Sequence, residues 1–149
     1  MKRAAIAFAA LLLAAGAHAS ERVDDSGTIV GTPVVAMRWR QLVPGRGADH
    51  TVEAQLRVAL RLNLARWQGQ QVRLYMALPP LGFGTVLATW RTQGRLLAGS
   101  LRSGSRTLVY EGPVSAPVLE ETLDLALATD GRALDRPETL NFTFELDPR

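Results

Sequence analysis

The sequence predicts an all-β fold, an antiparallel two-sheet, Ig-like sandwich of about seven strands. Three observations lead to this prediction. Residues 52–64 alternate apolar and polar side chains, which is the pattern of a strand with one buried face. Shorter alternating segments follow, and Gly- and Pro-containing turns separate them. No helical segment is predicted to carry the core, so the core has to form between two sheets.

The longest alternating segment is the centre of the predicted fold. Its even positions from Val52 to Leu64 are all apolar, and its odd positions are polar except for Ala59. The composition favours a helix, but in a helix residues two apart are rotated by about 200°, which would scatter the apolar side chains. Thirteen residues at ~3.3 Å each would span ~43 Å. We therefore expect this strand to bend or bulge near Ala59 and to contribute to both sheets.

The other strands follow in chain order. Residues 28–32 form an edge strand or a tail, because Pro33 lacks the N–H that a central strand needs. Residues 34–41 alternate, so that Trp39 is expected in the core and Arg38 and Arg40 in water. The remaining predicted strands lie at 72–78, 85–92, 106–111, 119–129 and 140–146.

The N-terminus is predicted to be a secretory signal peptide. Two basic residues precede a twelve-residue apolar run at 4–15, and small residues occupy 17 and 19. A membrane anchor would need about 20 apolar residues. We expect cleavage after Ala19, which divides the chain into a signal peptide (1–19), an N-terminal extension or edge strand (20–33) and a sandwich domain (34–149). The chain has no cysteine, so packing alone must hold the exported domain.

Charge and composition limit the classes of partner that we expect. Without the leader the chain has 17 − 2 = 15 basic residues, all arginine, and 14 acidic ones. A net charge of about +1 gives no reason to expect nucleic acid as a partner, and no second apolar run could span a membrane. The Ala-rich leader and the arginines are typical of a bacterial protein of the periplasm or cell surface.

Catalytic chemistry has few candidates. His50 is the sole histidine after the leader and follows Asp49, but no serine lies in a nucleophile-elbow motif. Glu120 and Asp124 are expected on the polar outer face of a strand rather than in a catalytic pair. Metal-ligand spacing is also absent from the sequence. We therefore predict no catalytic residue, metal site or cofactor, and a solvated loop histidine at His50.

Trp39 and its flanking arginines also have a functional interpretation. An exposed Trp–Arg surface in an exported protein could stack on carbohydrate or an anionic polymer. Alternation alone already explains these residues as a half-buried strand, and we take that as the main interpretation.

Both ends of the predicted sandwich carry apolar strand segments that need covering. Exposed strand edges are sites at which another chain can add a strand. We therefore predict a protein-partner interface at these ends, formed by Ile29, Val30, Gly31, Phe142, Phe144 and Leu146.

These two segments resemble those of the subunits of chaperone–usher fimbriae. Residues 28–32 are similar to an N-terminal donor segment with Gly31 as its small residue, and residues 140–146 to a C-terminal strand of alternating apolar residues. The resemblance implies an incomplete Ig-like sandwich, which a periplasmic chaperone and then a neighbouring subunit complete. The disulfide common in many such subunits has no counterpart here.

Three functions follow from these observations. The main prediction is an exported, non-enzymatic adhesive protein that binds protein partners through strand edges, with a fimbrial subunit as its most specific form. The alternative is a self-contained periplasmic module that binds a ligand or an envelope protein through Trp and Arg surfaces. A hydrolase using His50 is the third.

Overall fold

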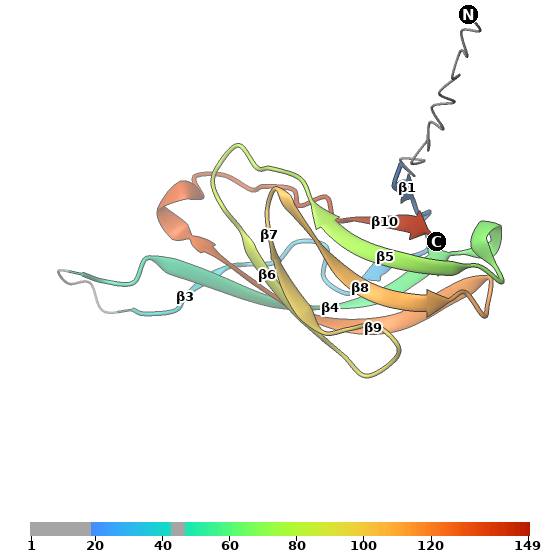
Figure 1. Ribbon diagram of the computed structural model, residues 1–149. Helices are drawn as coiled ribbons and strands as arrows, with labels where there is room; N and C mark the ends of the chain where they lie inside the picture. Colours follow the sequence, from blue (N-terminus) through green and yellow to red (C-terminus); the bar gives the residue numbers. More distant parts are fainter. Residues whose placement is uncertain (1–18, 43–46) are drawn as a thin grey trace, which may run out of the picture.

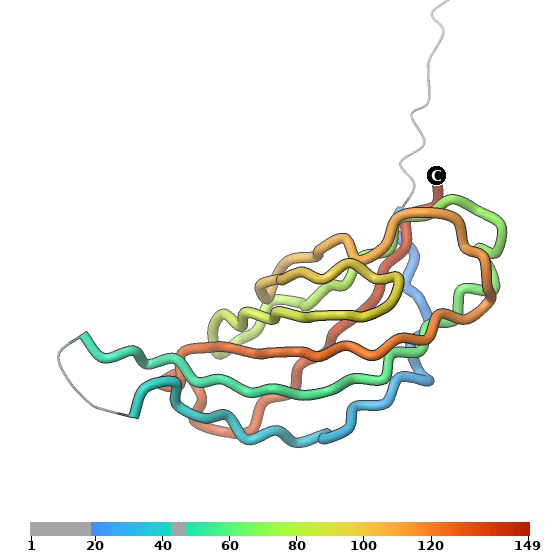
Figure 2. The backbone as a smooth tube through the Cα atoms, turned by 90° about the horizontal axis from the view of Figure 1, so that it is seen from below, coloured from blue at the N-terminus to red at the C-terminus, as the bar shows by residue number. Residues whose placement is uncertain are grey.

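The computed structural model describes residues 19–42 and 47–149, so that most of the predicted leader lies outside the described residues. Two antiparallel sheets pack face to face (Figures 1 and 2). The predicted all-β sandwich is confirmed. In the described residues the helical structure is limited to two short 3₁₀ turns, η1 (Ala65–Trp67) and η2 (Gly131–Ala133).

The two sheets differ in length. The short sheet has the strand order β1-β10-β5-β8, and the long sheet has the order β2-β4-β9-β6-β7, with β3 also paired to β4. The strands of the short sheet are β1 (Glu21–Arg22), β5 (Gln71–Leu78), β8 (Ser105–Pro113) and β10 (Thr143–Pro148). Those of the long sheet are β2 (Ile29–Val30), β3 (Arg38–Trp39), β4 (Thr51–Asn63), β6 (Leu87–Thr92), β7 (Gly99–Arg102) and β9 (Val118–Asp130).

Strands β4 and β9 form the spine of the long sheet. They pair residue by residue from Thr51 opposite Asp130 to Asn63 opposite Val118. The even positions of β4 point inward, as their alternation predicts, and Leu62 is completely buried. The predictions of a bulge near Ala59 and of a strand shared by both sheets are wrong, because β4 pairs with the equally long β9 without a break in register and belongs to the long sheet alone.

The irregularity occurs instead in the short sheet. The register of β5 against β8 shifts between Leu74 and Tyr75, which face Tyr110 and Leu108. Val109 is therefore the extra residue of a β-bulge, and its side chain is buried. The alternation of side chains along β8 therefore changes phase at the bulge.

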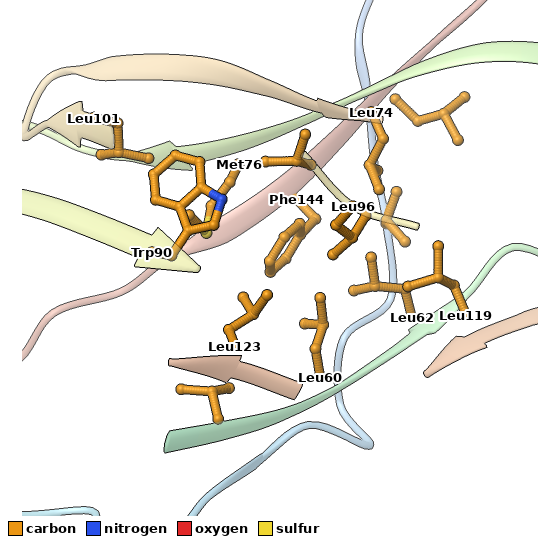
Figure 3. Close-up of a cluster of buried hydrophobic side chains, with 14 of the residues drawn as sticks. Leu60, Leu62, Leu74, Met76, Trp90, Leu96, Leu101, Leu119, Leu123 and Phe144 are labelled. Atoms are coloured by element: carbon orange, nitrogen blue, oxygen red, sulfur yellow. The ribbon is translucent and has the colours of Figure 1, made fainter. Parts of the chain in front are cut away.

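The core lies between the two sheets (Figure 3). Leu60 and Leu62 of β4 face Leu74 and Met76 of β5 and Phe144 of β10. The indole N–H of the buried Trp90 donates to the carbonyl of Leu97 at 2.8 Å, so that its polar atom is satisfied. This single core joins all the long strands of both sheets.

Two predicted strands are shorter than their sequence pattern. Of residues 34–41, Arg38–Trp39 alone forms a strand, β3, and the last strand begins at Thr143 rather than at residue 140. In both cases residues of the missing part, 34–37 and 140–142, run along an edge of the sandwich and make no backbone hydrogen bond to the described residues. Here β4 and β9 extend past the short sheet (Figure 1). The candidate functional site borders this part of the long sheet.

Candidate functional site

A groove of about 740 Å³ opens along one edge of the sandwich, between the long sheet and two irregular segments. We call these segments the N-terminal strap (residues 31–37) and the C-terminal strap (residues 134–142). The inner face of the long sheet forms the floor of the groove, which is apolar. The floor residues are the half-buried Leu56 and five residues that also belong to the buried core, Val58 and Leu60 of β4 and Leu123, Leu125 and Leu127 of β9.

The N-terminal strap exists because β2 and β3 pair with β4 in different registers. Ile29 lies opposite Ala59, whereas Arg38 lies opposite Glu53. From Ile29 to Arg38 the chain advances by nine residues, whereas the facing positions on β4 are six residues apart. The N-terminal strap therefore contains three surplus residues. The strap runs alongside β4 (Figure 2) and meets it at the Gly31 N–H, which donates to the Arg57 carbonyl at 3.1 Å.

The surplus residues leave a gap in the hydrogen bonding of β4. The carbonyls of Thr51 and Arg57 both accept bonds at this edge, so the backbone of Gln55 between them faces the same way. Among the described residues, no backbone group bonds to Gln55 at this edge, and residues 32–37 make no backbone hydrogen bond. Val34, in the strap, is 83% exposed.

The C-terminal strap is also unpaired. It leaves η2 at Leu134 and reaches β10 at Thr143, beyond the end of the neighbouring strand β5. Within the described part of the chain, residues 135–142 form no backbone hydrogen bond. Their N–H and C=O groups are therefore left to water or to a ligand. Leu140 and Phe142 of this strap pack partly against the core and line the groove.

Among the residues that the structure describes, three charged ones line the groove. Arg136 and Glu138, both on the C-terminal strap, form an ion pair at 3.0 Å. Asp25 is half-buried, and none of the ion pairs in the described residues includes it. The groove thus combines an apolar floor with one uncompensated carboxylate.

The predicted interface residues separate into three groups. Val30, Phe142 and Phe144 all line the groove, although they come from opposite ends of the chain. Ile29 points to the outer face and is 67% exposed, and the Gly31 N–H is bonded to the chain's own β4. Leu146 is completely buried in the core, so that its side chain offers no surface to a partner.

The position of Trp39 differs in one respect from the prediction made from the sequence. It lies opposite Val52 on the inward face of the long sheet, as the alternation predicts. The prediction that it belongs to the core is wrong, because the short sheet does not reach this end and Trp39 is 46% exposed. Its ring lies against Gly131, where a Cβ atom would come within 2.6 Å of the indole Cη2.

His50 lies near the same end and is exposed, as predicted. Its backbone carbonyl accepts the Gly131 N–H at 2.8 Å, so His50 stabilises this end of the sheet through its backbone. Neighbouring Asp130 accepts hydrogen bonds from the side chain and backbone N–H of Arg132, and these bonds lower the pKa of Asp130 to about 2. Asp130 also caps η2.

The acidic residues of β9 have structural partners. Glu120 and Asp124 lie on the outer face, as predicted, and pair with Arg61 and Arg57. Glu121 points inward, and its carboxylate accepts the backbone N–H groups of Gly94, Arg95 and Leu96 at 2.9–3.1 Å. This carboxylate therefore holds the loop between β6 and β7.

Several residues that line the groove were not predicted as interface residues, including Asp25, Met37 and Leu134. The sequence indicates the C-terminal strap only by the absence of a strand pattern, since residues 131–139 lack alternation and contain Pro137. No pattern in the sequence indicates that this segment lies opposite residues 31–37. The groove arises from tertiary structure.

Within residues 19–42 and 47–149, no three acidic or histidine side chains are grouped to hold a metal ion. The same residues include no helix that is long and apolar enough to cross a membrane. Neither a family model, nor a curated protein, nor a solved structure matches this chain.

Proposed function

We propose that this protein is an exported, non-enzymatic binding module that holds an extended segment of a partner protein in its edge groove. The observation that carries the proposal is the combination of an apolar floor with two flanking straps, in which residues 32–37 and 135–142 make no backbone hydrogen bond to the described residues. An extended polypeptide needs both features, because it presents apolar side chains on one face and hydrogen-bonding groups along its edges.

The dimensions of the groove suit such a segment. Its floor runs along β9 from Leu123 to Thr129, which corresponds to ~20 Å at ~3.3 Å per residue. A segment of about six residues would fill this length, with every second side chain on the floor. The free backbone groups of residues 136–142, which line the groove, would supply hydrogen bonds along one side of the segment.

The more specific proposal is a subunit of a chaperone–usher fimbria in the bacterial periplasm or at the cell surface. It is supported by the groove, whose walls include both terminal segments that resemble those of such subunits. In that case the partner segments would come from a chaperone and from a neighbouring subunit. Ile29 and Val30 are paired with the chain's own β4, so the groove, rather than β2, is the part left open for a partner.

A second candidate is a self-contained module for a small apolar ligand. Its support is the groove volume of about 740 Å³, which is within the range of about 300–1,000 Å³ typical of small-molecule sites. The pairing of β1 and β2 with their own sheets favours a domain that is complete by itself.

A peptide-display selection on the purified mature protein tests the main proposal. We expect the selected peptides to share a stretch of about six residues with alternating apolar positions and without an internal proline. Hydrogen–deuterium exchange should then show slower exchange of the amides of residues 135–142 when a selected peptide is bound, because those amides gain partners.

Two results would count against the proposal. One is a set of selected peptides without alternation that protect amides elsewhere. The other is protection of the floor residues by a small apolar compound while no peptide binds, which would favour the ligand-binding module.

A further inference from the structure

The charges of the groove are distributed unequally along its length. Asp25 lies at the end near Leu60, because Thr28, to whose N–H the Asp25 carbonyl is bonded, exchanges hydrogen bonds with the backbone of Arg61. Arg136 and Glu138 follow η2 on the C-terminal strap and compensate each other at 3.0 Å. Of the described residues that line the groove, Asp25 is therefore the one with an uncompensated charge.

The Asp25 carboxylate opposes the binding of a purely apolar segment. Asp25 is half-buried and lines the same groove as Val58, Leu60 and Phe144. A ligand that covers the groove would remove water from the carboxylate, and burial of an unpaired charge opposes binding. A cationic group on the ligand would replace that water with an ion pair.

We infer that the segment bound in the groove carries a lysine or arginine that pairs with Asp25, followed by apolar residues at alternate positions that lie on the floor. This inference rests on the proposed function and specifies its partner. The single charge near one end also determines how the segment is placed, since its basic residue has to lie beside the turn at residues 25–28.

The test uses four synthetic six-residue peptides with blocked termini. Each alternates three valines with two threonines and carries one charged residue, either Lys or Glu, at its first or its last position. Both positions are needed because the inference does not depend on the direction of the bound strand. Affinities come from NMR titrations of the mature protein, in which the shifted amides also identify the binding site.

Two variants complete the design. Asp25→Asn removes the proposed partner of the lysine. Asp24→Asn makes the same change of charge at the adjacent residue, which is exposed and does not line the groove. A general effect of net charge would therefore appear in both variants.

We expect the better of the two Lys peptides to bind the groove of the wild-type protein about fivefold more tightly than either Glu peptide. This preference should disappear in Asp25→Asn and persist in Asp24→Asn. Equal affinities for the Lys and Glu peptides at the groove would overturn the inference but leave the proposed function intact, as would a preference that survives in Asp25→Asn. If none of the four peptides shifts the groove amides, the proposed function itself fails.

Discussion

Ile29 and Val30 are adjacent residues of one short strand, and they face opposite sides of the long sheet. Ile29 lies opposite Ala59 on the outer face, whereas Val30 lies opposite Val58 and lines the groove. Two neighbouring β-branched residues thus differ mainly in their access to the proposed binding site, which makes them a matched pair for mutagenesis.

A carboxylate at either position should therefore have different effects on binding. We expect Val30→Asp to weaken the binding of a groove-bound peptide at least tenfold, because it places a second unpaired charge against the apolar floor. Ile29→Asp should leave the affinity unchanged within about twofold, since exposed positions tolerate substitution. Calorimetric titration of both folded variants measures the difference, and equal losses would argue against the groove as the site.

Glu121 and Glu120 form a second adjacent pair with different roles. Glu121 accepts three backbone N–H groups of the loop between β6 and β7, whereas Glu120 pairs with Arg61 on the exposed face. We expect Glu121→Gln to lower the free energy of unfolding by about 1.5–3 kcal/mol, and Glu120→Gln by at most about 1 kcal/mol. Urea denaturation would compare them, and a larger loss for Glu120→Gln would contradict the assignment.

Gly131 provides the surface on which Trp39 rests. A Cβ atom at this position would lie 2.6 Å from the Trp39 ring and 2.7 Å from Val52, so Gly131→Ala must displace the indole. The expected cost is about 1–3 kcal/mol of stability, with easier acrylamide quenching of Trp39 fluorescence. Gly82→Ala is the control, because a Cβ atom there meets nothing within 4 Å. Unchanged quenching in Gly131→Ala would refute this packing.

The hydrogen bonds from Arg132 make Asp130 unusually acidic. Its pKa is lowered from 3.8 to about 2, so the folded state binds this proton more weakly than the unfolded state does. The resulting contribution to stability is complete above about pH 4 and is lost as the pH falls toward 2. In Arg132→Gln we expect the pKa of Asp130 to rise toward 3.8, as measured by NMR titration of its carboxyl carbon. Arg136→Gln, which affects the pair with Glu138 instead, should not change it.

The sequence predicted the fold better than the site. Alternation identified the inward face of β4 correctly, because a continuous partner on β9 makes burial follow the period of two. The same rule placed Trp39 on the right face but in the wrong environment, since a pattern within one strand carries no information about where the opposite sheet ends.

The groove could not be predicted because its components are set by long-range pairing. Val30 and Phe142 were both expected to serve an interface, and they line the same groove. Their common location depends on the offset between two registers on β4 and on the end of β5 at Leu78. Neither feature leaves a local pattern in the sequence.

The three surplus residues of the N-terminal strap make the mouth of the groove adjustable without change to the sandwich. Deletion of three residues between Gly31 and Met37 would bring β2 and β3 into one register and pair Gln55, which would turn an open rim into an ordinary edge strand. Insertions there would widen the rim while the anchors at Val30 and Trp39 stay in place. Selection could thus vary the length of this segment to suit different binding partners while the core remains constant.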